Sequence, residues 1–175
     1  MLNLFLENFV LIFVAIDPIS LLPIFASFTQ GLDRNELKTL CLRCGLTVFI
    51  ILLVFWLFGS NVLELMGVSI NSLRIVGGFF LMIIAYQMVF EQRQKRRMDT
   101  AEKALDDEAL SSLATFPLAI PLIAGPGAIT ITILLSEKSG DSINTQLIGF
   151  SPVLIIILLS ILSLWLSGKI AKKLP

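Results

Sequence analysis

LFLENFVLIFVAIDPISLLPIFASF, which runs from Leu4 to Phe28, is the stretch that decides the fold. A helix needs about 20 mainly apolar residues to cross a bilayer, because each residue adds roughly 1.5 Å against a hydrocarbon layer about 30 Å thick. This stretch is long enough, yet Asp17-Pro18 interrupts it near its middle. A backbone break at that depth is tolerated only where it is buried in protein or lines a polar cavity. The stretch therefore predicts a membrane protein with an internal site.

A second stretch repeats this pattern. It covers residues 113–135, LATFPLAIPLIAGPGAITITILL, and is interrupted by Gly125-Pro126. Two breaks at corresponding depths in the two halves of a chain are the best sequence indication of a substrate site in a transporter. The pair of interrupted stretches therefore favours transport.

The composition supports a membrane protein and argues against an enzyme. Of the 175 residues, 56% are hydrophobic and only 15% are charged, and the mean hydropathy is +0.91. A soluble core of this size cannot bury so much apolar surface. Histidine is absent, which removes the usual general base and the commonest metal ligand. The sequence therefore predicts no enzymatic activity, no cofactor, no metal site and no nucleic-acid partner.

The apolar stretches predict an all-α, polytopic membrane protein. Five spans follow from the length rule, with boundaries uncertain by a few residues. They are Leu4–Phe28, Leu40–Phe58, Leu73–Phe90, Leu113–Leu135 and Leu147–Gly168.

The distribution of Lys and Arg predicts the orientation, because these residues stay on the cytoplasmic side. They alternate between loops, with the largest group at Arg93–Arg97. We therefore expect a multi-pass protein of the bacterial inner membrane with its amino terminus outside and the 91–112 segment in the cytoplasm. With five spans the carboxyl terminus is also cytoplasmic. For the 91–112 segment, a solvated linker is favoured over a short amphipathic helix on the membrane surface.

The two interrupted spans run in opposite directions across the membrane, as in an inverted repeat. This predicts a first three-helix repeat over 1–90, a cytoplasmic linker over 91–112 and a second repeat over 113–175. When Asp17-Pro18 is aligned on Gly125-Pro126, the counterpart of Leu73–Phe90 falls beyond Pro175. The second repeat is therefore expected to lack its third helix.

The residues at the breaks predict two half-helices that begin near the membrane midplane. Proline is favoured in the first turn of a helix, and Asp and Gly are accepted as the preceding cap. Two positive helix ends would then meet and attract a carboxylate. The candidate substrate-binding residues are Asp17, Pro18, Ser20, Gly125, Pro126, Gly127 and Thr130.

Asp17 allows two interpretations. It is the only acidic residue inside the core of a predicted span, where burying a charge costs about 2.5 to 3.5 kcal/mol. In the first interpretation it only caps its own half-helix. In the second it binds the substrate ammonium group or a coupling cation, or carries a proton. The two roles can coexist.

Both interrupted stretches resemble the signature segments of the MarC family of bacterial inner-membrane proteins. The resemblance rests on residues 17–25 and 117–130 and extends to Asn71–Gly78. It implies a six-span helical protein related to the LysE-type amino-acid exporter superfamily, some of whose relatives are described as neutral amino-acid transporters. Family members continue into a sixth span after Lys173, where this chain ends.

Three functions are compatible with the sequence. The favoured hypothesis is a secondary transporter of small neutral amino acids or similar zwitterions, with H⁺ or Na⁺ as the coupling ion. The alternative is a non-transporting scaffold or remnant that keeps the family fold. An ion or metal channel is third, because one carboxylate and no histidine supply few ligands. The expected partners are a small-molecule substrate, the lipid bilayer and, to cover an exposed face, a second copy of the chain.

Overall fold

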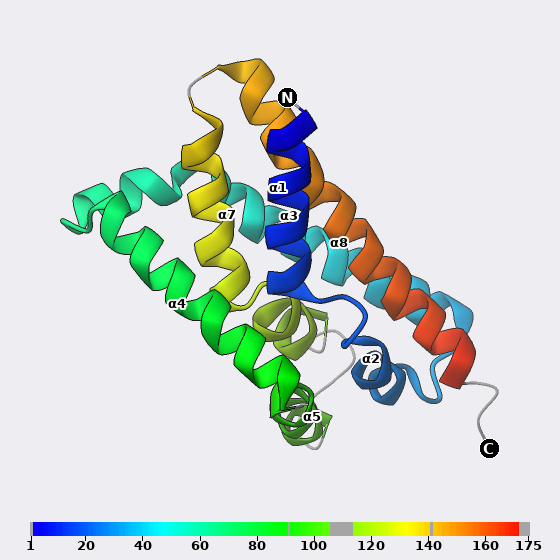
Figure 1. Ribbon diagram of the computed structural model, residues 1–175. Coiled ribbons are helices and arrows are strands. Elements are labelled where there is room, and N and C mark those ends of the chain that lie inside the picture. The colour runs from blue at the N-terminus through cyan, green and yellow to red at the C-terminus, as the bar shows by residue number, and fades with distance from the viewer. Residues whose placement is uncertain (1, 91, 106–113, 141, 172–175) are drawn as a thin grey trace.

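A computed structural model describes residues 2–90, 92–105, 114–140 and 142–171, and the described part is helical with no strand. The elements are α1 (Leu2–Ile16), α2 (Leu22–Thr29), α3 (Arg34–Leu65), α4 (Ile70–Val89), α5 (Gln92–Leu105), η1 (Ala114–Ile123), α7 (Pro126–Ser139) and α8 (Ile143–Ala171) (Figure 1). The prediction of an all-α fold is confirmed.

Three of the described helices, α3, α4 and α8, are long and apolar enough to cross a bilayer. η1 and α7 together make a fourth candidate that is bent by 63°. These four candidates match the second to fifth predicted spans. The first predicted span is divided into α1, which is apolar but only 15 residues long, and the short helix α2. The count of five spans and the inverted repeat therefore stay predictions.

The long helices begin where local sequence provides a cap. Asp33 precedes α3, and its carboxylate accepts hydrogen bonds from the backbone N–H groups of Asn35 and Glu36. The Glu36 side chain accepts from the Asp33 N–H, which completes a capping box. Ser69 caps α4 by accepting from the Ser72 N–H. These caps satisfy N–H groups that a helix leaves without partners.

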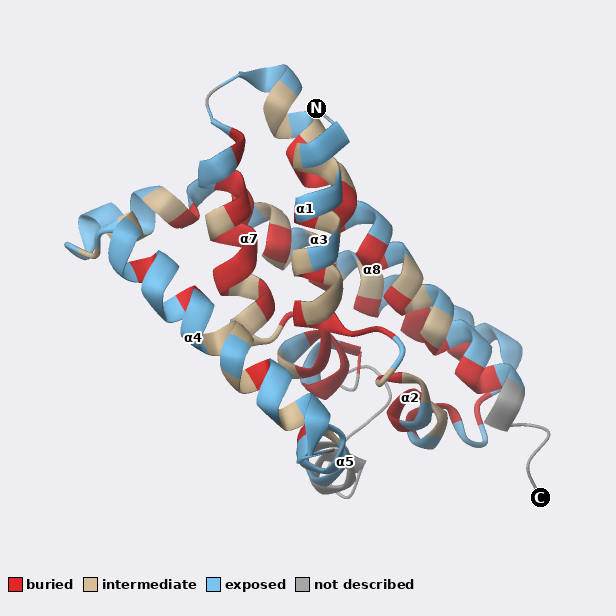
Figure 2. Cartoon of the chain, viewed as in Figure 1, coloured by how far each residue is buried: buried red, intermediate tan, exposed pale blue. Residues whose placement is uncertain are grey.

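α1 and α7 lie side by side at the centre of the bundle and pack on α8 and α3 (Figure 1). Figure 2 colours the buried residues red, and they cover more of α7 than of α1. Ile12 on α1, Leu52 on α3 and Ile156 on α8 are completely buried in this core. α4 makes its main contacts with α7 and α5 only, and most of its side chains are exposed. Exposed apolar side chains on such a helix fit contact with lipid.

Polar groups link the helices at the end of the bundle opposite α5. The Asn8 amide donates to the Gly149 carbonyl at 3.1 Å, and the Trp56 indole donates to Gln146 Oε1 at 2.6 Å. Glu7 on α1 and Lys138 on α7 form an ion pair at the surface. These contacts hold α1, α3, α7 and α8 together at this end.

The segment after α4 differs from the favoured interpretation of the sequence. Gln92–Leu105 forms the helix α5, and Arg93 is only 9% exposed. The solvated interpretation therefore fails at Arg93 and Arg97, which are held against the end of α1, whereas residues 92, 94–96, 98 and 99 of the same helix are exposed. The acidic part of the linker, Asp106–Glu108, lies outside the described residues.

We predict that Gly77→Val destabilises the protein by about 1 to 3 kcal/mol, whereas Gly78→Val has a smaller effect. A Cβ atom at Gly77 would lie 2.5 Å from Leu134 Cδ1 on α7, and one at Gly78 would meet no atom within 4 Å. Forcing extra atoms into a packed contact costs this much. Thermal unfolding of the purified variants measures the difference, and equal midpoints for both would contradict the packing of α4 on α7.

Candidate functional site at the helix breaks

The first break begins at Asp17, whose φ of 54° ends α1. Asp is one of the few residues that accept this left-handed backbone. Its backbone N–H still donates to the Phe13 carbonyl, and its Oδ1 accepts from the Ser20 N–H at 3.3 Å. α2 then begins only at Leu22, with Pro23 in its first turn.

The prediction that Asp17 and Pro18 begin a half-helix is therefore wrong. Asp17 ends α1 and its carboxylate caps the turn that follows. Proline in the first turn is a sound signal for a helix start, but the signal belongs to Pro23.

The second break agrees with the sequence. Gly125 is extended, with φ −76° and ψ 170°, and Pro126 begins α7. Before it, Phe116 (φ −127°, ψ 128°) and Ile120 (φ −123°, ψ 127°) are non-helical because each precedes a proline. The chain therefore reaches Gly125 as an irregular segment, and α7 turns the N–H groups of its first turn toward the break.

Two arginines from α5 bind the carboxyl end of α1, and the sequence did not predict this contact. Arg93 donates from Nη1 to the Val14 carbonyl at 3.0 Å and from Nη2 to the Ala15 carbonyl. Arg97 donates from Nη2 to the Ile16 carbonyl at 2.9 Å. These carbonyls have no partner within α1, and a helix end of this kind carries a partial negative charge. The spacing of Arg93 and Arg97, which places both on one helix face, was the available signal.

Asp17 completes this cluster. It is 5% exposed, and its Oδ2 lies 4.0 Å from Arg93 Nη1, close enough for an ion pair but too far for a hydrogen bond. Asp17 therefore reduces the positive charge of the arginine pair without satisfying all of its own oxygens.

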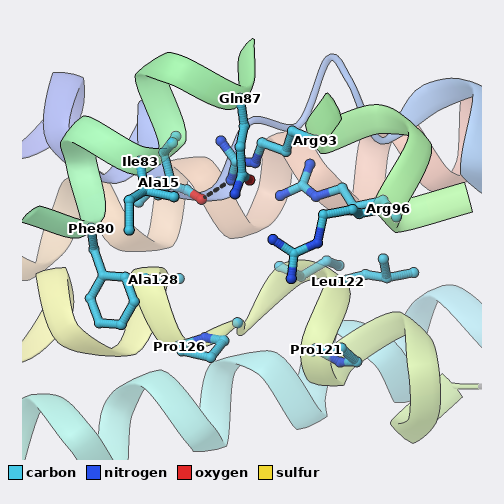
Figure 3. Close-up of a pocket in the computed structure, with 15 residues that line it drawn as sticks. Ala15, Phe80, Ile83, Gln87, Arg93, Arg96, Pro121, Leu122, Pro126 and Ala128 are labelled. Atoms are coloured by element: carbon cyan, nitrogen blue, oxygen red, sulfur yellow. Dashed lines mark hydrogen bonds between the residues drawn. The ribbon is translucent and has the colours of Figure 1, made fainter. Parts of the chain in front are cut away.

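A cavity of about 270 Å³ lies beside this cluster, between α4, α5, η1 and α7. In Figure 3, Arg93 and Arg96 face Pro121 and Pro126 across it. None of the described residues that line it is acidic. They are Ala15, Phe80, Ile83, Ile84, Gln87, Arg93, Arg96, Arg97, Pro121, Leu122, Ile123, Gly125, Pro126, Gly127 and Ala128.

Arg97 gives the cavity a positive charge that is not fully compensated. Its Nη1 atom is buried and has no hydrogen-bond partner. Burial and the neighbouring charge of Arg93 lower the pKa of Arg97 to about 10, although Asp17 opposes this shift. An anion placed between Arg97 and the first turn of α7 would satisfy both.

A second and larger cavity, about 620 Å³, lies at the other end of α7. Its buried polar groups already bind one another: Ser136 Oγ donates to the Trp56 carbonyl, and Gln146 Nε2 donates to the Ser136 carbonyl at 3.2 Å. The smaller cavity is therefore the better candidate site, since it contains the unpartnered donor and a helix end.

Residues 2–175 match the MarC family, which is described as a family of integral membrane proteins. The chain belongs to the MarC family. It is 35% identical to a UPF0056 membrane protein of Methanocaldococcus jannaschii over 86% of this chain and 65% of that protein. It is also 35% identical to one from Archaeoglobus fulgidus, over 88% of this chain and 71% of the relative. YvbG of Bacillus subtilis is 28% identical over 98% of this chain and 83% of its own length.

The chain thus spans about two thirds of the length of the first two relatives. The names of all three relatives describe membrane proteins and assign no activity. No solved structure matches the chain. Membership of the MarC family confirms the resemblance inferred from residues 17–25 and 117–130.

Only part of the predicted set lines the cavity of this MarC protein. Gly125, Pro126 and Gly127 line it, and Asp17 reaches its edge through Arg93. Pro18, Ser20 and Thr130 are not among the lining residues, and a Cβ atom at Gly77 would lie 3.5 Å from the Thr130 methyl group.

The expectation that two positive helix ends meet at one cavity is also wrong. The end of α1 lies beside the cavity, and this end is negative, whereas the start of α2 does not line it.

We predict that Arg93→Gln lowers the free energy of unfolding by about 1.5 to 3 kcal/mol, because the charge-assisted hydrogen bonds to Val14 and Ala15 are lost. Lys95→Gln is the matched control, since Lys95 is exposed on the same helix. Denaturation of both variants in detergent measures the difference. Similar stability for the two would show that α5 does not hold the end of α1.

Proposed function

We propose that this MarC-family protein is a secondary transporter of a small solute that carries a carboxylate group, such as a small neutral amino acid or a similar zwitterion. It would carry this solute across the bacterial inner membrane. The observation that supports the proposal is the unpartnered Nη1 of Arg97, which lines the same cavity as the first turn of α7.

The chemistry of the cavity favours a carboxylate. Guanidinium groups match the two oxygens of a carboxylate, and such pairs are the strong hydrogen bonds of proteins. The N–H groups at a helix start add a partial positive charge at the opposite wall. Gly127 leaves space for a solute at this wall, because a Cβ atom at this position would lie 3.1 Å from Ile84 Cδ1.

The size and lining favour a small solute. A volume of about 270 Å³ is slightly below the range of about 300 to 1,000 Å³ that is typical for drug-sized ligands, so it suits a small solute. Phe80, Ile83 and Ile84 on α4 supply an apolar wall that accepts a short aliphatic side chain.

The contacts between α1 and α7 favour alternating access. α1 ends at the first break and α7 begins at the second, and at the opposite ends of these helices the Glu7–Lys138 pair connects them. The cavity lies at the end that α5 covers. A rocking motion that separates Glu7 from Lys138 and closes the cavity would expose the solute to the other side.

We predict that Arg97→Gln reduces carboxylate-dependent flux by about 10- to 100-fold, because one charge-assisted hydrogen bond is worth about 1.5 to 3 kcal/mol. Asp17→Asn should also reduce flux, since it frees Arg93 from its ion pair. Lys95→Gln should leave flux unchanged. Proteoliposome uptake and counterflow with a panel of small amino acids measure these effects. No flux with any solute of the panel, from protein that is folded, would contradict the proposal.

A further inference from the structure

Oxygen atoms gather at the end of α1 in a way that the solute cavity does not explain. The carbonyl oxygens of Val14, Ala15 and Ile16 all point beyond the helix and accept from side chains of α5. Asp17 Oδ2 lies next to them, 4.0 Å from the nitrogen that binds Val14. Three carbonyl oxygens and one carboxylate oxygen therefore surround the two guanidinium groups.

The carboxylate is the independent sign that this place binds a cation. Asp17 is only 5% exposed, and its Oδ2 atom has no hydrogen-bond partner. A buried carboxylate oxygen without a hydrogen-bond partner is costly. The nearest cation to this oxygen is Arg93, which is the same side chain that donates to the carbonyls of Val14 and Ala15.

The present ligands are cations tethered to another helix. Arg93 and Arg97 both belong to α5, and both also line the solute cavity. Their two positive charges face one carboxylate and a helix end worth about half a negative charge. A solute carboxylate in the cavity would neutralise this excess positive charge. The carboxylate would also draw the Arg97 guanidinium group away from the Ile16 carbonyl.

We propose that the end of α1, with Asp17, is a binding site for a small monovalent cation, and that Arg93 and Arg97 occupy this site in the present conformation. One carboxylate and neutral carbonyls suit a single positive charge, whereas divalent ions are held by more carboxylates. Movement of Arg97 toward a bound carboxylate frees the site for Na⁺ or K⁺. The role of this ion in coupling rests on the proposed function, but its binding does not.

The test removes the Arg97 guanidinium group and supplies free cations in solution. The full chain and its Arg97→Ala variant are unfolded by heat in chloride salts of Na⁺, K⁺, guanidinium and choline, at equal ionic strength and below denaturing concentration. We expect the Arg97→Ala midpoint to rise by at least about 3 °C in Na⁺, K⁺ or guanidinium relative to choline. The unchanged protein should show no such difference in chloride salts.

The controls separate a site from a general salt effect. Lys95→Ala removes an exposed charge from the same helix and should respond to no cation. Arg97→Ala combined with Asp17→Asn should lose the shift. An Arg97→Ala midpoint that is the same in all four salts, or a shift that Asp17→Asn leaves intact, would overturn the proposal.

A second measurement needs no arginine variant, in case Arg97→Ala does not fold. Acetate serves as the carboxylate probe for the unchanged protein. Sodium acetate should raise the midpoint more than choline acetate does, because acetate draws Arg97 from the cation site. Equal midpoints would overturn the proposal. A cation shift without any solute flux would contradict the transport function alone, and flux that depends on Arg97 without a cation shift would contradict the cation site alone.

Discussion

The donation of two guanidinium groups from α5 to the last carbonyls of α1 is the interaction on which the described structure depends. A helix that ends inside an apolar bundle leaves carbonyl groups that neither lipid nor water satisfies, and each such group costs several kcal/mol. Arg93 and Arg97 satisfy three of them. The same contact places α5 beside the start of α7, so the arginines that satisfy the end of α1 also form one wall of the cavity.

Opposite helix ends approach one another through these arginines. α1 presents its negative end and α7 presents its positive end. The guanidinium groups of Arg93 and Arg97 line the cavity between these two ends, and Asp17 pairs with Arg93. The described lining of the cavity consequently carries positive side chains and no carboxylate, although the chain has a formal net charge of zero. Local arrangement, and not overall charge, decides which solute the site favours.

The MarC family gives this chain a place among integral membrane proteins, and the matched residues include α1, α5 and α7. The names of its relatives in Methanocaldococcus jannaschii and Bacillus subtilis assign no activity. The functional argument therefore depends on chemistry: an unpartnered Arg97 nitrogen, a helix start and a cavity of suitable size.

The sequence by itself determined the helical class, the apolar helices α3, α4 and α8 that are long enough to cross a bilayer, and the existence of both breaks. These features follow from hydropathy and from proline, whose effects act within a few residues. The start of α7 at Pro126 could be predicted for the same reason.

Only the tertiary structure decided where α2 begins, that α5 is held against α1, and which helix ends share the cavity. Arg93 bonds to residues that lie 79 and 78 positions away in the chain. In the sequence, its basic neighbours indicate a solvated segment, because local composition does not report a buried acceptor supplied by another helix. The physical reason is that unpaired carbonyls exist only once α1 has ended inside the bundle, and their partners are whichever donors the fold brings within reach.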